Sequence, residues 1–116
     1  MPSETIMSKK VKISFVIPES LQKDLKERIV FDGYNLKGKS LWVAEAVERL
    51  LKINSYIDLV KVNDVMQGFE KFESVLIDRK LKIQLDESVI SIRKRYPEIE
   101  GVQSRIMRTA ILQRLL

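Results

Sequence analysis

Residues 11–21 have the sequence VKISFVIPESL, in which every second residue up to position 17 is apolar. Alternation with a period of two residues predicts a half-buried β-strand. Pro18 follows, and a proline suits the first turn of a helix because the amide hydrogen that it lacks would have no partner there. The segment therefore predicts a short strand that leads directly into a helix ending near residue 31. The residues expected to be buried are Val11, Ile13, Phe15 and Ile17 on the strand, and Leu21, Leu25 and Ile29 on the helix.

A second segment, residues 79–89, has a similar pattern with the sequence RKLKIQLDESV. Leu81, Ile83 and Leu85 alternate with polar residues, and a Glu-Ser pair follows them as it does in the first segment. This pattern predicts a second strand over about 79–85, with Asp86 as the N-cap of the helix that follows. That helix is expected to end by Tyr96, because a proline comes next and disfavours helical backbone in the residue before it.

Each segment is followed by a further predicted helix, SLWVAEAV at 40–47 and SRIMRTAI at 104–111. In both, the serine is expected to be the N-cap, and Trp42 and Met107 are expected in the core. The predicted organisation is thus a strand-helix-helix module that occurs twice in one chain. Its parts are a flexible arm at 1–8, the first module at 9–53, a connector at 54–76 that is helical near 56–67, and the second module at 77–116, with 9–116 forming one compact domain.

The composition argues against an enzyme. The chain has 116 residues and a net charge of +5, and it contains neither histidine nor cysteine. Disulfides, thiolate nucleophiles, histidine bases and nearly all zinc or copper sites are therefore excluded. Paired carboxylates such as Glu45 with Glu48 fall on expected helix surfaces, so we expect no catalysis and no cofactor. We also expect a cytoplasmic protein without a membrane partner, because the sequence contains no apolar run of membrane-spanning length.

Both modules are net positive and flank an acidic connector, which favours a polyanionic partner. Two basic strand-helix-helix modules resemble the ribbon-helix-helix (Arc/MetJ) DNA-binding family, in which two chains each contribute one strand to an antiparallel ribbon. Since both strands lie in one chain here, the sequence resembles the tandem proteins of conjugation systems, of the TraY type. The resemblance implies a mostly α fold with a two-stranded antiparallel β-ribbon. In it, two ribbon-helix-helix (β-α-α) modules form an intramolecular pseudodimer, and the connector is partly helical.

The resemblance also implies which residues contact DNA, because in this family the outward face of the ribbon lies in the major groove. The base-contacting positions are then Lys12, Ser14 and Val16 on the first strand, and Lys80, Lys82 and Gln84 on the second. The starts of the two last helices would bind phosphates through free backbone N–H groups. The residues expected at phosphates are Gly38, Lys39, Ser40, Val102, Gln103 and Ser104, together with the cations Lys9, Lys10, Lys37, Arg79 and Arg105.

The sequence therefore predicts a sequence-specific double-stranded DNA-binding protein, acting as a transcriptional regulator or as a relaxosome-type accessory factor of a mobile element such as a plasmid. Unlike residues on the two strands predict a non-palindromic site, and the small footprint of one module pair predicts side-by-side self-association on DNA. No small-molecule effector is expected. An exposed strand lysine by itself indicates only solubility. Two other functions therefore stay open, namely an antitoxin-like protein-interaction module and a non-specific DNA-packaging protein.

Overall fold

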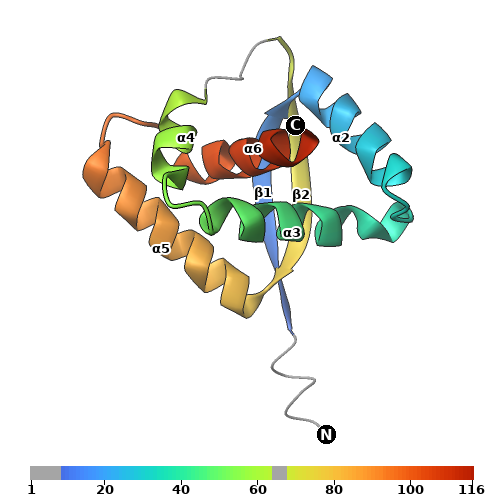
Figure 1. The fold of residues 1–116 in the computed structure, drawn as a ribbon, viewed down its shortest axis with the longest axis horizontal. Coiled ribbons are helices and arrows are strands. Elements are labelled where there is room, and N and C mark those ends of the chain that lie inside the picture. The colour runs from blue at the N-terminus through green and yellow to red at the C-terminus, as the bar shows by residue number, and fades with distance from the viewer. Residues whose placement is uncertain (1–8, 64–67) are drawn as a thin grey trace, which may run out of the picture.

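The computed structural model describes residues 9–63 and 68–116, so the predicted arm at 1–8 lies outside the described residues. Within them the protein is mostly helical, with a two-stranded antiparallel sheet. Figure 1 shows α3 and α6 crossing the two strands, with α2 and α5 on opposite sides of the molecule. The elements in chain order are β1 (Lys10–Pro18), α2 (Glu19–Phe31), the 3₁₀ helix η1 (Leu36–Gly38), α3 (Lys39–Leu51), α4 (Tyr56–Val62), β2 (Glu70–Asp78), α5 (Arg79–Arg95) and α6 (Val102–Leu115).

The two strands pair antiparallel over their full length, with Ser14 of β1 opposite Ser74 of β2 at the centre. Since successive side chains on a strand point to opposite faces, one face of this ribbon is turned toward the helices and the other away from them. The strand predicted at 11–17 is confirmed. The buried face of the ribbon consists of Ile13, Phe15 and Ile17 from β1, and Glu73, Val75 and Ile77 from β2.

The second strand predicted at 79–85 is wrong, because these residues form the first turns of α5 and β2 lies directly before them. Leu81 and Leu85 are one helical turn apart and both are buried, whereas Ile83, which a strand would also bury, is 53% exposed. Asp78 caps this helix, accepting a 2.8 Å hydrogen bond from the backbone N–H of Leu81. The predicted N-cap, Asp86, lies inside α5.

The connector predicted at 54–76 is too long, because residues 70–76 belong to β2. Helix α4, at Tyr56–Val62, lies where a helix is predicted near 56–67, and residues 64–67 are outside the described part of the chain. The guanidinium of Arg105 donates to the carbonyl oxygens of Val60 and Lys61 at 2.8 and 2.6 Å. These last carbonyls of a helix have no partner inside it, so Arg105 both satisfies them and fastens α4 to α6.

The serine N-caps predicted for α3 and α6 are also wrong. Helix α3 begins at Lys39 after Gly38, and α6 begins at Val102 after Gly101. Gly101 has a φ of 59°, in the left-handed region that glycine enters without steric cost. Ser40 and Ser104 therefore lie within the first helical turn, with their hydroxyl groups free to bond to other elements. The predicted ends of the earlier helices hold, since α2 ends at Phe31 and α5 at Arg95, two residues before a proline.

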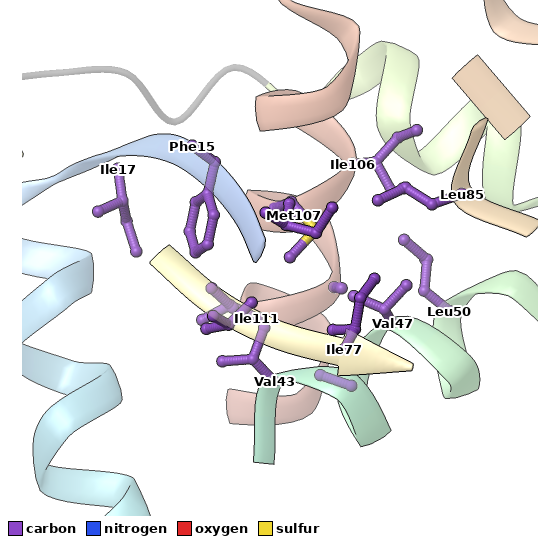
Figure 2. Close-up of a cluster of buried hydrophobic side chains, with 14 of the residues drawn as sticks. Phe15, Ile17, Val43, Val47, Leu50, Ile77, Leu85, Ile106, Met107 and Ile111 are labelled. Atoms are coloured by element: carbon purple, nitrogen blue, oxygen red, sulfur yellow. The ribbon is translucent and has the colours of Figure 1, made fainter. Parts of the chain in front are cut away.

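One hydrophobic core joins both parts of the chain. Helix α3 packs against α6, and both pack on the ribbon. Trp42 of α3 and Met107 of α6 are fully buried, as expected from the sequence. None of the described helices is long and apolar enough to cross a membrane. Figure 2 shows side chains from the strands and from α3, α5 and α6 meeting in this core, among them Phe15, Ile17, Val43, Val47, Leu50, Ile77, Leu85, Ile106, Met107 and Ile111.

Candidate nucleic-acid interface

The outward face of β1 has the residues that the sequence predicts for it. Lys10, Lys12 and Ser14 are exposed, and Val16 is partly exposed. They alternate with the buried side chains of the same strand, so they lie together on the face of the ribbon that is turned away from the core. The helices pack against the opposite face (Figure 1). A row of two lysines, a serine and a valine is therefore available to a partner.

The outward face of β2 contains Phe72, Ser74 and Leu76, with Glu70 and Asp78 at its two ends, and none of these five is a contact predicted from the sequence. Phe72 is 83% exposed and Leu76 is 49% exposed. Phe72 lies opposite Val16, and Leu76 lies opposite Lys12. Residues 70–78 show no apolar-polar alternation, because apolar Phe72 and Leu76 lie on the outward face and Glu73 occupies a buried position.

Lys80, Lys82 and Gln84 are not brought together with Lys12, because they lie on α5 and not on a strand. The ammonium group of Lys82 is 2.5 Å from the carboxylate of Asp86, one helical turn later. Lys80 and Gln84 line an open groove together with Asp78 and residues from α3 and α4. The prediction that these three residues contact bases required a strand at 79–85, so it is wrong as well.

The first turns of α3 and α6 contact the ribbon in equivalent ways. The hydroxyl oxygen of Ser40 accepts a 2.9 Å hydrogen bond from the backbone N–H of Leu76. The hydroxyl oxygen of Ser104 accepts a 3.1 Å hydrogen bond from the backbone N–H of Val16. Next to it, the side-chain amide of Gln103 donates to the carbonyl oxygen of Ser14 at 3.1 Å. Both helix starts are thereby held at the borders of the outward face, where the sequence predicts phosphate contacts.

The side chain of Lys39, a predicted phosphate contact, is engaged inside the protein. Its ammonium group lies 2.6 Å from the carboxylate of Glu73, which also accepts a 2.6 Å hydrogen bond from Gln22. Glu73 is 7% exposed, and a buried carboxylate is strongly disfavoured unless it is paired. We therefore infer that the side chain of Lys39 stabilises the folded protein rather than binding a phosphate. Arg105 is likewise committed to the end of α4.

The remaining predicted phosphate contacts divide by exposure. Lys9, Lys10, Lys37 and Arg79 have exposed side chains, and Lys9 and Lys10 precede or begin β1. Gly38 and Val102 are buried, and the backbone N–H of Gly38 donates to the carbonyl oxygen of Asn35 at 2.8 Å, so a phosphate contact through this N–H is not supported. The exposed cations therefore fall in three places. Lys9 and Lys10 lie at one end of the ribbon, Lys37 lies near the start of α3, and Arg79 lies at the start of α5.

A second polar cluster, between the first half of α3 and the last turn of α6, stabilises the fold. The side chain of Arg114 is 9% exposed and donates to the carbonyl oxygen of Trp42 at 2.6 Å and to the carboxylate of Glu45 at 3.1 Å. The hydroxyl of Tyr34 also donates to Glu45. This hydrogen bond from Tyr34 is the largest influence that lowers the pKa of Glu45 below its usual 4.5. Arg114 and Arg49 lower it further, against the opposing effect of burial.

No group of three or more acidic side chains among residues 9–63 and 68–116 could hold a metal ion. The outward face of the ribbon presents lysine and serine donors together with apolar side chains. Comparisons of the chain with protein-family models, with curated proteins and with solved structures found no match.

Proposed function

We propose that this protein binds double-stranded DNA by inserting the outward face of its two-stranded ribbon into the major groove. The observation that supports this most is the ribbon itself, which has one face packed on helices and the other exposed with lysine and serine side chains. The major groove of B-DNA is wide enough for a two-stranded β-ribbon, and its floor presents a distinct pattern of donors and acceptors for each base pair. Lysine and serine are among the side chains suited to that pattern.

The finer fold that we propose is a tandem ribbon-helix-helix, in which each half of the chain supplies one strand and two helices. Three relationships support it. The order strand, helix, helix occurs twice, with α4 between. Ser14 and Ser74 pair at the centre of the ribbon, so the two strands match about a two-fold axis through that pair. The hydrogen bonds of Ser40 with Leu76 and of Ser104 with Val16 are exchanged by the same axis.

The second half differs from the first in one respect. α2 has 13 residues and α5 has 17, so α5 is about one turn longer. An insertion of a whole turn keeps the buried face of the helix in line. The second strand predicted at 79–85 is centred eight residues later than β2, which lies at Glu70–Asp78. With β2 in that place the two halves match up to the end of α2.

Phosphate contacts would come from groups around the ribbon face. Helix starts present backbone N–H groups and the positive end of the helix dipole, which favour anions. The starts of α3 and α6 flank the ribbon, and exposed lysines at positions 9, 10 and 37 add charge. Because each neutralised phosphate releases counterions, binding should weaken with salt by a slope of about −0.9 per phosphate in a log–log plot. The roles that this proposal fits are those of a transcriptional regulator or an accessory factor at a DNA site.

The experiment that tests this proposal is selection of bound sites from random duplex DNA, followed by titration of the selected duplex with variants. A ribbon variant with Lys12→Ala, Phe72→Ala and Leu76→Ala should lose preference for the selected site. Each good base contact is worth about 1–3 kcal/mol, so the loss should reach at least about fivefold per contact. The matched control is Lys80→Ala with Gln84→Ala on α5, which should bind as the wild type does. Equal affinity of the wild type for every duplex, or unchanged selectivity of the ribbon variant, would contradict the proposal.

A further inference from the structure

The two ends of the outward ribbon face differ in chemistry. At one end, Lys12 lies opposite Leu76, and Lys10 lies opposite Asp78, whose carboxylate caps α5. At the other end, Val16 lies opposite Phe72, no lysine of either strand shares the outward face, and exposed Glu70 lies opposite Pro18. The lysines of the outward face are therefore confined to one end, and its exposed aromatic ring lies at the other.

The apolar end is not explained by packing within the protein. Phe72 is 83% exposed, although it belongs to a strand whose other face is buried. A cross-strand pair of an aromatic and a β-branched residue stabilises a ribbon to a limited degree, and Val16 provides that pairing. An aromatic ring that is exposed at one end of a candidate interface nevertheless offers apolar area for a partner to cover.

We propose that the Val16–Phe72 end contacts the 5-methyl groups of thymines, while the Lys10–Lys12 end contacts guanines. This inference rests on the proposed function and names the class of DNA site. The thymine methyl is the one apolar group that a base pair presents in the major groove, and lysine donates to guanine O6 and N7. The site is then non-palindromic, with a thymine-rich half and a guanine-containing half.

The spacing of the two halves follows from strand geometry. Lys12 and Val16 are four residues apart on one strand, which corresponds to about 13 Å. Base pairs are stacked at about 3.4 Å, so the two contacts should lie about four base pairs apart. Ser14 and Ser74, at the centre of the ribbon, would face the base pairs between them.

Lys12 and Phe72 help to determine which end of the ribbon contacts which half of the DNA site. The two-fold axis through the Ser14–Ser74 pair exchanges Lys12 with Phe72, and Val16 with Leu76. Val16 and Leu76 are both aliphatic, so they contribute similarly to both halves. Lys12 and Phe72 are unlike, and so are Lys10 and Glu70, which the same axis exchanges, so the orientation of the protein on its site should depend on these two differences.

The test uses the selected duplex with single-atom changes. Deoxyuridine lacks only the 5-methyl group of thymidine, and 7-deazaguanine lacks only the N7 acceptor. Deoxyuridine in the thymine-rich half should weaken binding about three- to fivefold per contacted methyl. The Phe72→Ala variant should bind more weakly and should respond less to deoxyuridine than the wild type does. The Lys12→Ala variant should respond less to 7-deazaguanine in the other half.

A matched control and a swap make the test specific. Phe31 is 85% exposed at the end of α2, so Phe31→Ala removes an equally exposed ring outside the ribbon and should leave the deoxyuridine effect intact. The variant that swaps both unlike pairs, Lys10→Glu, Lys12→Phe, Glu70→Lys and Phe72→Lys, should bind the same duplex in reversed orientation. Because the chain has no cysteine, a single Lys9→Cys substitution can direct cleavage of the DNA from one end of the ribbon and report the orientation.

The outcomes distinguish this inference from the proposed function. If no duplex is selected at all, the proposed function fails. If a duplex is selected and the ribbon variants lose it, but deoxyuridine has no effect in the wild type, the DNA-binding function stands and the thymine assignment is overturned. If Phe72→Ala changes the sedimentation behaviour of the free protein while DNA affinity stays the same, the exposed ring belongs to a protein contact and the assignment is likewise overturned.

Discussion

The hydroxyl oxygen of Ser104, in the first turn of α6, accepts a 3.1 Å hydrogen bond from the backbone N–H of Val16 in β1. The two residues are 88 positions apart, and the bond is partly buried. An outer amide of a two-stranded ribbon has no third strand to pair with, so a side chain from a helix takes that role. Ser40 does the same for Leu76 on the other strand, in a more exposed position.

This relationship predicts the effect of removing the hydroxyl groups. Ser104→Ala should lower the free energy of unfolding by about 1 kcal/mol, because the amide of Val16 loses its acceptor in a partly buried place. Ser40→Ala should cost less, since water can reach the amide of Leu76. Urea unfolding of both variants measures the difference. Ser91→Ala, an exposed serine on α5, is the control and should change stability by less than about 0.5 kcal/mol.

The ion pair between Lys39 and Glu73 supplies a second prediction. Lys39→Met should destabilise the protein by about 1–3 kcal/mol, because the carboxylate of Glu73 stays buried with fewer donors. The double variant Lys39→Met, Glu73→Leu should recover much of this loss, since a buried ion pair replaced by apolar residues is often close to neutral. Equal stability of Lys39→Met and the wild type in urea unfolding would mean that Lys39 is free for another role, such as a phosphate contact.

A third prediction concerns the buried hydroxyl of Thr109, which joins α6 to the end of α4. It accepts a 2.5 Å hydrogen bond from the side-chain amide of Asn63 and donates to the carbonyl oxygen of Arg105 at 2.7 Å. Thr109→Val preserves the shape but leaves the amide of Asn63 without this acceptor, so we expect a loss of about 1–3 kcal/mol. Thr109→Ser retains the hydroxyl and should be less destabilising. A valine variant with the melting temperature of the wild type would show that this bond contributes nothing.

The fourth prediction is a pH dependence that originates at Glu45. Its pKa is lowered in the folded protein, chiefly by the hydrogen bond from Tyr34 and also by Arg114. A carboxylate with a lowered pKa stabilises the folded state above its usual pKa of 4.5, and this contribution disappears as the pH falls through the lowered value. Glu45→Gln should therefore be less stable than the wild type at pH 7, and the difference should shrink below pH 4.5. Urea midpoints measured from pH 7 to pH 3 provide the comparison, and a constant difference would contradict the assignment.

The sequence was sufficient for β1 and α2, because only one periodicity fits each of them. Ile13, Phe15 and Ile17 alternate cleanly, and Leu21, Leu25 and Ile29 follow the helical repeat. All six are buried. The coarse fold class and the end of α5 before Pro97 were predictable for the same reason, since each depends on a local and unambiguous signal.

The second strand was misplaced because two periodicities compete in residues 79–85. Leu81, Ile83 and Leu85 fit a strand, but Leu81 and Leu85 also fit a helix that continues to Ser88 and Ile92. The true strand was hidden by Glu73, whose buried position depends on Lys39 and Gln22 from other elements. Local patterns contain no information on such a distant partner. The outward residues Phe72, Ser74 and Leu76 were missed for this reason, and Lys80, Lys82 and Gln84 took their place.

The pairing of Ser14 with Ser74 has a consequence for how the protein folds. The helices form from contacts between neighbours in sequence, whereas the ribbon needs residues 60 positions apart to meet. Closing a loop of that length costs about 3–4 kcal/mol in chain entropy before any contact across it forms. Proteins with many distant contacts fold more slowly than helical bundles of equal size. We therefore expect the ribbon to be assembled at or after the rate-limiting step, so that the outward face exists only once both halves of the chain have docked.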